Sequence, residues 1–169
     1  LTNRGELDEA EASLAKLGLP EEVAESGHLI FFLGARGWVR HARRDFEGAV
    51  SDFERLGRCM ERFEMRNPAV LAWRSHLALA LLSLKRRDEA LELAQEEVGL
   101  ARAWGAPRPL GVALRVQGLA EGGSEGIETL RESLSVLEGS SAKLERARTL
   151  VQLGAALRRA NARVEAREL

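Results

Sequence analysis

The sequence predicts an all-α fold in which antiparallel helix pairs stack one after another. The first observation is a unit that recurs along the chain. In most copies this unit consists of a polar turn, followed by an acidic residue and then by a small residue. The small residues are Ala10, Ala49, Ala90, Gly126 and Ala166. Subtracting their residue numbers gives intervals of 39, 41, 36 and 40. An acidic first turn suits the positive end of a helix dipole. The second observation is that no segment alternates polar and apolar residues for long enough to predict a strand.

Other residues recur at fixed offsets from these small residues. Four positions later, on the same helical face, stand Leu14, Phe53, Ala94 and Leu130. Twelve positions earlier, three copies carry a second small residue: Gly37, Ala78 and Gly154. The fourth copy has Leu114 there, beside Ala113, and its short interval indicates a trimmed turn. Matched small residues let two helices cross closely, so each unit is expected to be a helix, a short turn and a second helix.

The elements follow in order along the chain. Helices are expected at residues 7–17, 28–43, 46–65, 67–85 and 88–104. A fourth pair follows, and a fifth pair begins near residue 142 and is cut off in its second helix, from Val164 onward. Asn67-Pro68 is interpreted as the start of the 67–85 helix, since proline is favoured in a first helical turn. The other residues that end helices or form turns are Gly18, Pro20, Gly105, Pro107, Gly122 and Gly123.

Composition narrows the class of protein. The chain has 169 residues, 45% of them hydrophobic and 30% charged, with a net charge of -1. These values fit one globular domain over residues 1–169 and give no overall attraction to nucleic acid or to acidic membranes. The longest apolar run, residues 77–84, is too short to span a bilayer. Cys59 is the single cysteine, which fits a reducing compartment such as the cytoplasm. Because the chain begins with Leu1 rather than methionine, we expect it to be a fragment of a longer protein.

The repeated unit resembles the tetratricopeptide repeat (TPR) over essentially the whole chain, with units longer than the usual ~34 residues. The resemblance implies a right-handed superhelical solenoid of about four repeats. Residues 150–160 and 163–169 further resemble the repeat region of large LuxR-type, maltose-regulator-like transcription activators. In that family the region lies between an ATPase module and a DNA-binding helix-turn-helix. The resemblance therefore implies that nucleotide and DNA would be bound by domains outside this chain.

No catalytic, cofactor or metal signature is found in the sequence. His28, His41, His76 and Cys59 lack the spacing of metal ligands, so a structural role is favoured for all four. Cys59 is expected to be a buried, inert thiol. Gly122-Gly123 lacks the lysine and the preceding strand of a phosphate-binding loop and is interpreted as an inter-helix turn. We therefore predict a non-enzymatic protein that needs no cofactor.

The candidate binding residues lie on the first helix of each pair, which in the TPR family lines the concave surface. They are Trp38, His41, Arg108, Arg115, Arg158 and Arg159. The early part of this surface is aromatic and apolar, and the late part is rich in arginine, which recognises carboxylates and phosphates. Such a groove fits an acidic peptide, a partner helix or an anionic small molecule. The alternative is that the tryptophans pack between helices and the arginines are solvated or paired with acids of their own helices.

These observations favour a sensor or protein-interaction segment of a cytoplasmic bacterial regulator. Abundant arginine with only three lysines is typical of a high-GC coding sequence, which favours a bacterial source. The partner of this segment would be a protein, a peptide or a small-molecule inducer. Self-association of the segment through uncapped repeat ends is also expected. Two alternatives remain: a peptide-docking adaptor with no role in transcription, and a helical accessory domain of an enzyme whose active site lies elsewhere.

Overall fold

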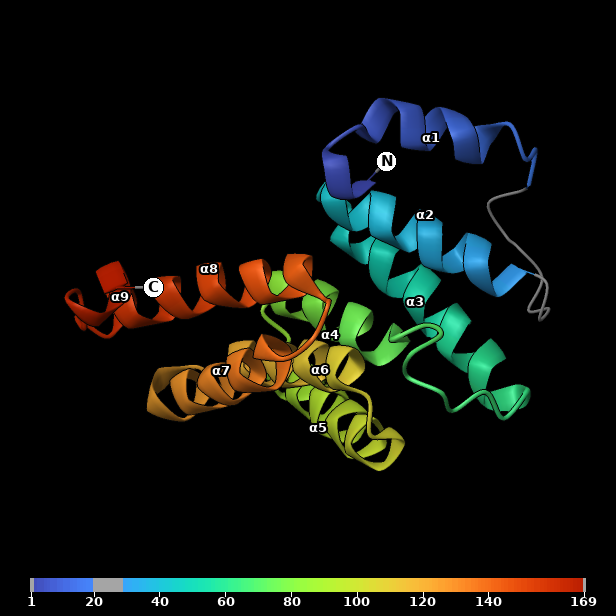
Figure 1. Ribbon diagram of the computed structural model, residues 1–169. Helices are drawn as coiled ribbons and strands as arrows, with labels where there is room; N and C mark the ends of the chain where they lie inside the picture. Colours follow the sequence, from blue (N-terminus) through green and yellow to red (C-terminus); the bar gives the residue numbers. More distant parts are fainter. Residues whose placement is uncertain (1, 20–28, 169) are drawn as a thin grey trace.

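The computed structural model describes residues 2–19 and 29–168, and within these ranges it contains helices and no strands. The predicted all-α fold is confirmed (Figure 1). The predicted helix residues His28 and Leu169, and the helix-ending Pro20, lie outside the described residues. The helices are η1 (Thr2–Arg4), α1 (Leu7–Ala15), α2 (Ile30–Ala42), α3 (Phe46–Arg62), α4 (Trp73–Ser83), α5 (Arg87–Trp104), α6 (Pro107–Glu121), α7 (Gly123–Glu138), α8 (Lys143–Arg159) and α9 (Glu165–Glu168).

Successive helices form antiparallel pairs that stack into a solenoid. The pairs are α2 with α3, α4 with α5, α6 with α7, and α8 with α9, while α1 packs on α2 before the first pair (Figure 1). The first helices also contact one another in sequence, α2 with α4, α4 with α6, and α6 with α8. They therefore form a continuous row, and any site on that row is built from residues far apart in the chain.

The turns inside three of the helix pairs, α2–α3, α4–α5 and α8–α9, share one geometry, which explains the repeated pattern in the sequence. Each contains a non-glycine residue in the left-handed region: Arg44 at φ 68°, Lys85 at φ 64° and Asn161 at φ 61°. In each turn the next backbone N–H donates to the carbonyl five residues earlier, over 2.9, 3.0 and 2.9 Å. This bond ends an α-helix in a Schellman turn. All three turns stand five residues before the small residue of the next helix, so the repeat has a local backbone origin.

The α6–α7 pair, which is the fourth copy of the sequence unit, departs from this geometry, and the predicted register there is wrong. Only Gly122, at φ 58°, separates α6 from α7. The small residue that crosses Gly126 is Gly118, because a Cβ on Gly118 would lie 2.8 Å from the Gly126 carbonyl oxygen. The sequence pattern predicts Leu114 at this position. The difference of four residues is about one helical turn, so the predicted face of α6 is retained although the register is not.

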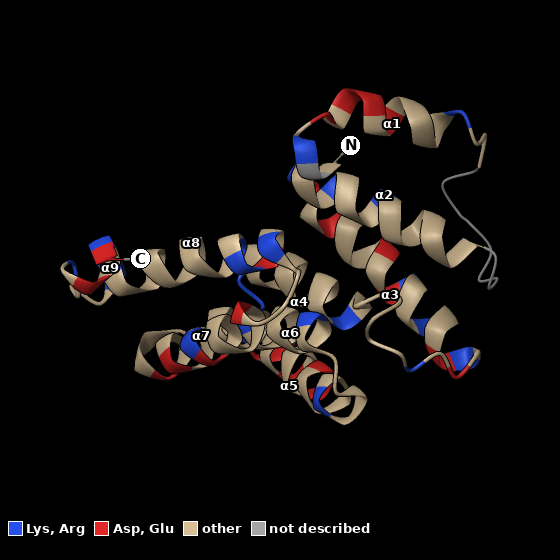
Figure 2. Ribbon diagram, viewed as in Figure 1, with Lys and Arg blue, Asp and Glu red and all other residues tan. Residues whose placement is uncertain are grey.

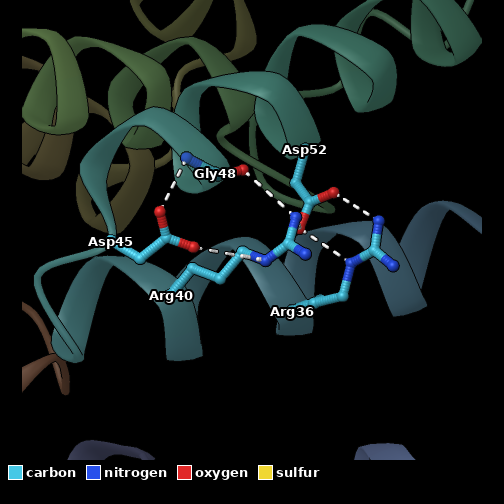
Figure 3. A network of polar contacts seen from close by, with 5 residues as sticks. All are labelled: Arg36, Arg40, Asp45, Gly48 and Asp52. Atoms are coloured by element: carbon cyan, nitrogen blue, oxygen red, sulfur yellow. Dashed lines mark hydrogen bonds and ion pairs between the residues drawn. The ribbon is translucent and has the colours of Figure 1, made fainter. Parts of the chain in front are cut away.

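A buried ionic network joins α2 to α3 (Figure 3). Asp52 is fully buried and accepts hydrogen bonds from Arg36 Nε at 2.9 Å and from Arg40 Nη1 at 3.0 Å. A further Arg36 nitrogen lies 2.6 Å from the same carboxylate. Asp45 caps α3 by accepting the Gly48 N–H at 3.0 Å, and it also lies 3.7 Å from Arg40. These arginines thus hold two helices together and are structural.

The largest buried cluster lies between α2, α3, α4 and α5, around Phe53 and Trp73. Cys59 is fully buried in it, as predicted. Trp73 also stacks against the guanidinium of Arg74, 4.3 Å from its ring centroid. By contrast, Trp104 at the end of α5 is 53% exposed. One predicted packing tryptophan is therefore in the core and one is on the surface.

Candidate functional site

A cavity of about 670 Å³ opens along the row of first helices. Its wall comes from α2, α4, α6 and α8 and from the segment that leads into α4. Ligand-binding pockets in proteins commonly enclose ~300–1,000 Å³, so the size suits a small molecule or a short peptide segment. Its lining residues are Trp38, His41, residues 68–72, His76, Leu79, Arg108, Pro109, Val112, Arg115, Glu145, Ala147, Arg148, Val151 and Gln152.

The segment before α4 forms one rim of this cavity, and here the predicted helix start is wrong. Asn67-Pro68 does not begin the helix, which starts only at Trp73. The Asn67 side chain accepts the Ala69 N–H at 2.8 Å, which makes a side-chain-stabilised turn in place of a first helical turn. Val70 in this segment is 45% exposed and faces the cavity. Residues 68–72 therefore line the cavity as a non-helical segment in place of a first turn of α4.

The part of the wall formed by α2 and α4 is aromatic and apolar. Trp38 lies 4.5 Å from His76 and 5.7 Å from His41, both centroid to centroid and edge-on. Leu79 lies one turn beyond His76 on α4 and lines the same wall. Val151 of α8 also lines the cavity and is 66% exposed. Apolar side chains from α2, α4 and α8 therefore line the same cavity.

The part of the wall formed by α6 and α8 is basic. Arg115 is buried and donates to the Glu145 carboxylate at 2.6 Å, and Arg148 donates to the other Glu145 oxygen at 2.8 Å. Arg108, at the start of α6, is exposed and forms no ion pair within the described part of the chain. Figure 2 shows basic residues in the first turns of α8, where this helix contacts α6. The lining of the cavity thus holds three arginines and one carboxylate.

The two histidines are kept neutral at pH 7 mainly by burial. Burial, together with the positive charges of Arg115, Arg108 and Arg148, lowers the pKa of His76 to about 3. Burial also lowers the pKa of His41. His76 Nδ1, His41 Nε2 and Arg115 Nε are buried and form no hydrogen bond with the described residues. These atoms are therefore unsatisfied polar groups enclosed within the wall, and they are not exposed to the cavity.

The structure brings four of the six candidate binding residues to this cavity: Trp38, His41, Arg108 and Arg115. Arg158 lies at the far end of α8, ten residues beyond Arg148, which corresponds to about 15 Å along the helix axis. It lines a separate shallow depression together with Arg163 and Arg167. Arg159 is exposed and does not line the cavity. The two basic groups of the predicted surface are therefore spatially separate.

Several lining residues were not among the candidates drawn from the sequence. Val151 and Gln152 follow Arg148 by three and four residues, so helical periodicity from Arg148 predicts that they share its face. No short-range sequence pattern identifies Glu145 as a lining residue, because its partner Arg115 lies thirty residues earlier in the chain. His76 was found in the sequence but was given a purely structural role.

A second polar cluster lies where the end of α3 meets α4 and α5. Arg74 is buried, 2.8 Å from Glu96, 3.6 Å from Glu61 and 3.9 Å from Glu97. Burial raises the pKa of Glu97 to about 7, although the charge of Arg74 opposes this shift. Glu97 therefore titrates near neutral pH, unlike an ordinary surface carboxylate.

Two further properties concern the described residues alone. They contain no group of three histidine, cysteine, aspartate or glutamate side chains placed to hold a metal ion. None of their helices combines the length and the low charge that crossing a bilayer would require.

Comparison with known proteins supports the fold. The sequence matches no protein-family profile and no curated protein. Among solved structures, the apo form of RapI superposes with a TM-score of 0.72 at 15% identity over 96% of this chain and 61% of RapI. TPR-like repeats of a putative kinesin light chain from Podosopora anserina superpose with a TM-score of 0.58 at 18% identity over 99% of this chain and 85% of that one. A point variant of those repeats gives a TM-score of 0.60. The chain is thus similar in fold to TPR-like repeat proteins, and it spans less than two thirds of the length of RapI.

Proposed function

We propose that this chain is a non-catalytic interaction module that binds a segment of a partner protein in the cavity between α2, α4, α6 and α8. The observation that carries the proposal is the cavity itself. It is built by four successive repeats and has an exposed apolar wall beside an excess of positive charge. A folded monomer gains nothing from leaving Val70 and Val151 exposed in a concave surface, whereas a docked segment would cover them.

The chemistry of the lining favours docking over catalysis. The lining residues include no serine, threonine, cysteine, lysine or aspartate. The one carboxylate, Glu145, has both oxygens engaged by Arg115 and Arg148, so it is poorly placed to accept a proton. His41 and His76 stand beside Trp38 and not beside a nucleophile. A nucleophile and a base within hydrogen-bond reach are the minimum for covalent catalysis.

We further propose that the parent protein is a cytoplasmic bacterial regulator of the LuxR-type, maltose-regulator-like kind. The support is the resemblance of residues 150–160 and 163–169, which here form most of α8 and α9. The full-length sequence tests this proposal. A phosphate-loop motif before this segment and a helix-turn-helix after it are expected. A catalytic domain in their place would instead favour the alternative of an accessory domain of an enzyme. If the full-length sequence contained neither these two motifs nor a catalytic domain, the docking adaptor would remain.

Selection from a displayed library of short random peptides tests the docking function. Peptides enriched on the wild-type chain should bind it in a one-to-one ratio by calorimetry. Ala147 lines the cavity but is exposed, so Ala147→Trp should block the opening without disturbing the core. We expect this variant to bind about tenfold or more weakly. Gln95→Trp, an exposed site on α5 that does not line the cavity, is the matched control. If the two variants bind alike, the cavity is not the docking site.

A further inference from the structure

The charge of the cavity wall identifies the chemistry of the segment that fits it. Resting on the docking function above, we propose that the cavity selects an acidic peptide in which a carboxylate side chain contacts Arg108 while a neighbouring apolar side chain packs against Trp38 and Val151. The occupant is therefore a stretch of another protein that alternates acidic and apolar residues. It is neither a free anion nor a nucleic acid.

The positive charge of this wall is local and is not a property of the whole chain. The complete sequence has 25 lysines and arginines against 26 aspartates and glutamates. The cavity lining, in contrast, holds three arginines and one glutamate. Burial keeps the two histidines of the lining neutral, so they neither add to nor cancel this excess. A concave wall with an excess of one sign of charge concentrates its field on a ligand of the opposite sign.

The three arginines are not equally able to contact a ligand. Arg115 is 7% exposed and is held by Glu145, so its role is to position that carboxylate and to add charge. The Arg148 side chain is 34% exposed and uses one nitrogen for Glu145. Arg148 therefore adds positive charge to the wall. Arg108 is exposed at the start of α6 and forms no ion pair in the described part of the chain. Arg108 is therefore the contact for an incoming acid, and Arg115 and Arg148 add positive charge beside it.

The apolar part of the lining separates a peptide from other anions. An inorganic ion or a small dicarboxylate would pair with the arginines but leave Val70 and Val151 in water. Nucleic acids demand a row of cations along an extended surface, and here Arg148 is about 15 Å from Arg158 along α8. A peptide supplies both an acidic group and an apolar group within two residues.

The composition of the library-selected peptides gives the first test. Glutamate or aspartate should be enriched next to leucine, valine or an aromatic residue. Replacing the acid of a selected peptide by its amide should weaken binding about tenfold, because a hydrogen bond to a charged group is lost. Raising the salt concentration should weaken binding of the acidic peptide and leave the amide version nearly unchanged.

Matched arginine variants give the second test. Arg108→Gln should weaken binding of the acidic peptide about tenfold, whereas Arg146→Gln, an equal charge loss at an exposed site of α8 outside the cavity, should change it less than about threefold. Neither variant should alter the helical circular dichroism. Selected peptides that need the open cavity but show no acidic preference would overturn the acidic specificity and leave the docking function intact. Full displacement by succinate at the concentration of the peptide would instead show a small-anion site and would also overturn the proposal.

Discussion

The close crossing of α6 and α7 gives a sharp test of the fold, because one added methyl group should change stability in opposite directions at two glycines. Gly118 lies in α6 where α7 crosses it. A Cβ there would stand 2.8 Å from the backbone oxygen of Gly126, and 2.9 and 3.1 Å from Cγ and the backbone nitrogen of Leu130. Gly99 lies in α5, away from both ends of that helix, and its Cβ would meet nothing within 4 Å.

The expected magnitudes follow from these distances. A carbon normally approaches a carbonyl oxygen to ~3.3–3.6 Å and another carbon to ~3.5–4.0 Å, so Gly118→Ala must separate the helices by about half an ångström or more. Overpacking of this kind costs ~1–3 kcal/mol, and we take about 2–3 kcal/mol because two of the three neighbours are backbone atoms. Alanine recovers ~1 kcal/mol of helix propensity. Gly118→Ala should therefore lower the free energy of unfolding by about 1–2 kcal/mol, and Gly99→Ala should raise it by about 1 kcal/mol.

Urea denaturation followed by circular dichroism measures both variants against the parent chain. Thermal melts should agree, since 1 kcal/mol shifts the Tm of a chain of this size by about 2–4 °C. The direction in which each variant changes the free energy of unfolding is a more secure test of the helix crossing than the size of the change. If Gly118→Ala is as stable as Gly99→Ala, the two helices do not cross at Gly118, and the register assigned to the fourth repeat is incorrect.

Three other changes test the core and the buried charges. Ala90→Leu should cost ~1–3 kcal/mol of unfolding free energy in urea melts, because Ala90 is fully buried at a helix crossing. Asp52→Asn should cost ~3–5 kcal/mol, since it leaves Arg36 and Arg40 without their buried carboxylate, and an unchanged melt would refute the network. The raised pKa of Glu97, about 7, means that its contribution to stability is fully present below the unfolded value of 4.5 and is lost as the pH rises through 7. Glu97→Gln should therefore stabilise the chain at pH 8 and much less at pH 5, and equal effects at both would contradict the assignment.

The fold was largely predictable from the sequence because the repeat has a local cause. The Schellman turns at Arg44 and Lys85 place a polar residue in the left-handed region just before each acidic first turn. The small residues Ala49 and Ala90 then follow at a constant offset and are fully buried. Local turn chemistry and helix crossing thus act on the same short stretch of chain, and such a pattern is visible without any long-range information.

The site was predictable only where helical periodicity carries the information. The register of α6 was misplaced from Gly118 to Leu114, yet Arg108 and Arg115 still line the cavity, because a shift of four residues is close to one full turn. No comparable periodicity fixed how far along α8 the cavity extends. Arg158 was therefore grouped with Arg115, although the cavity ends well before it.

The cavity is built where the chain departs from its own repeat. The turn at Asn67-Pro68 replaces the first expected turns of α4 by a non-helical rim of the cavity. The one-residue connection at Gly122 replaces the Schellman turn of the other pairs and changes how α7 crosses α6. The buried Arg115–Glu145 pair then joins α6 to α8 in the wall of the cavity. A buried ion pair is weak evidence for stability, because desolvation offsets most of its attraction. We interpret the role of the Arg115–Glu145 pair as positional: it holds two helices of different repeats at a fixed separation, with Arg148 beside them. A site for an acidic segment requires such a fixed arrangement of positive charges.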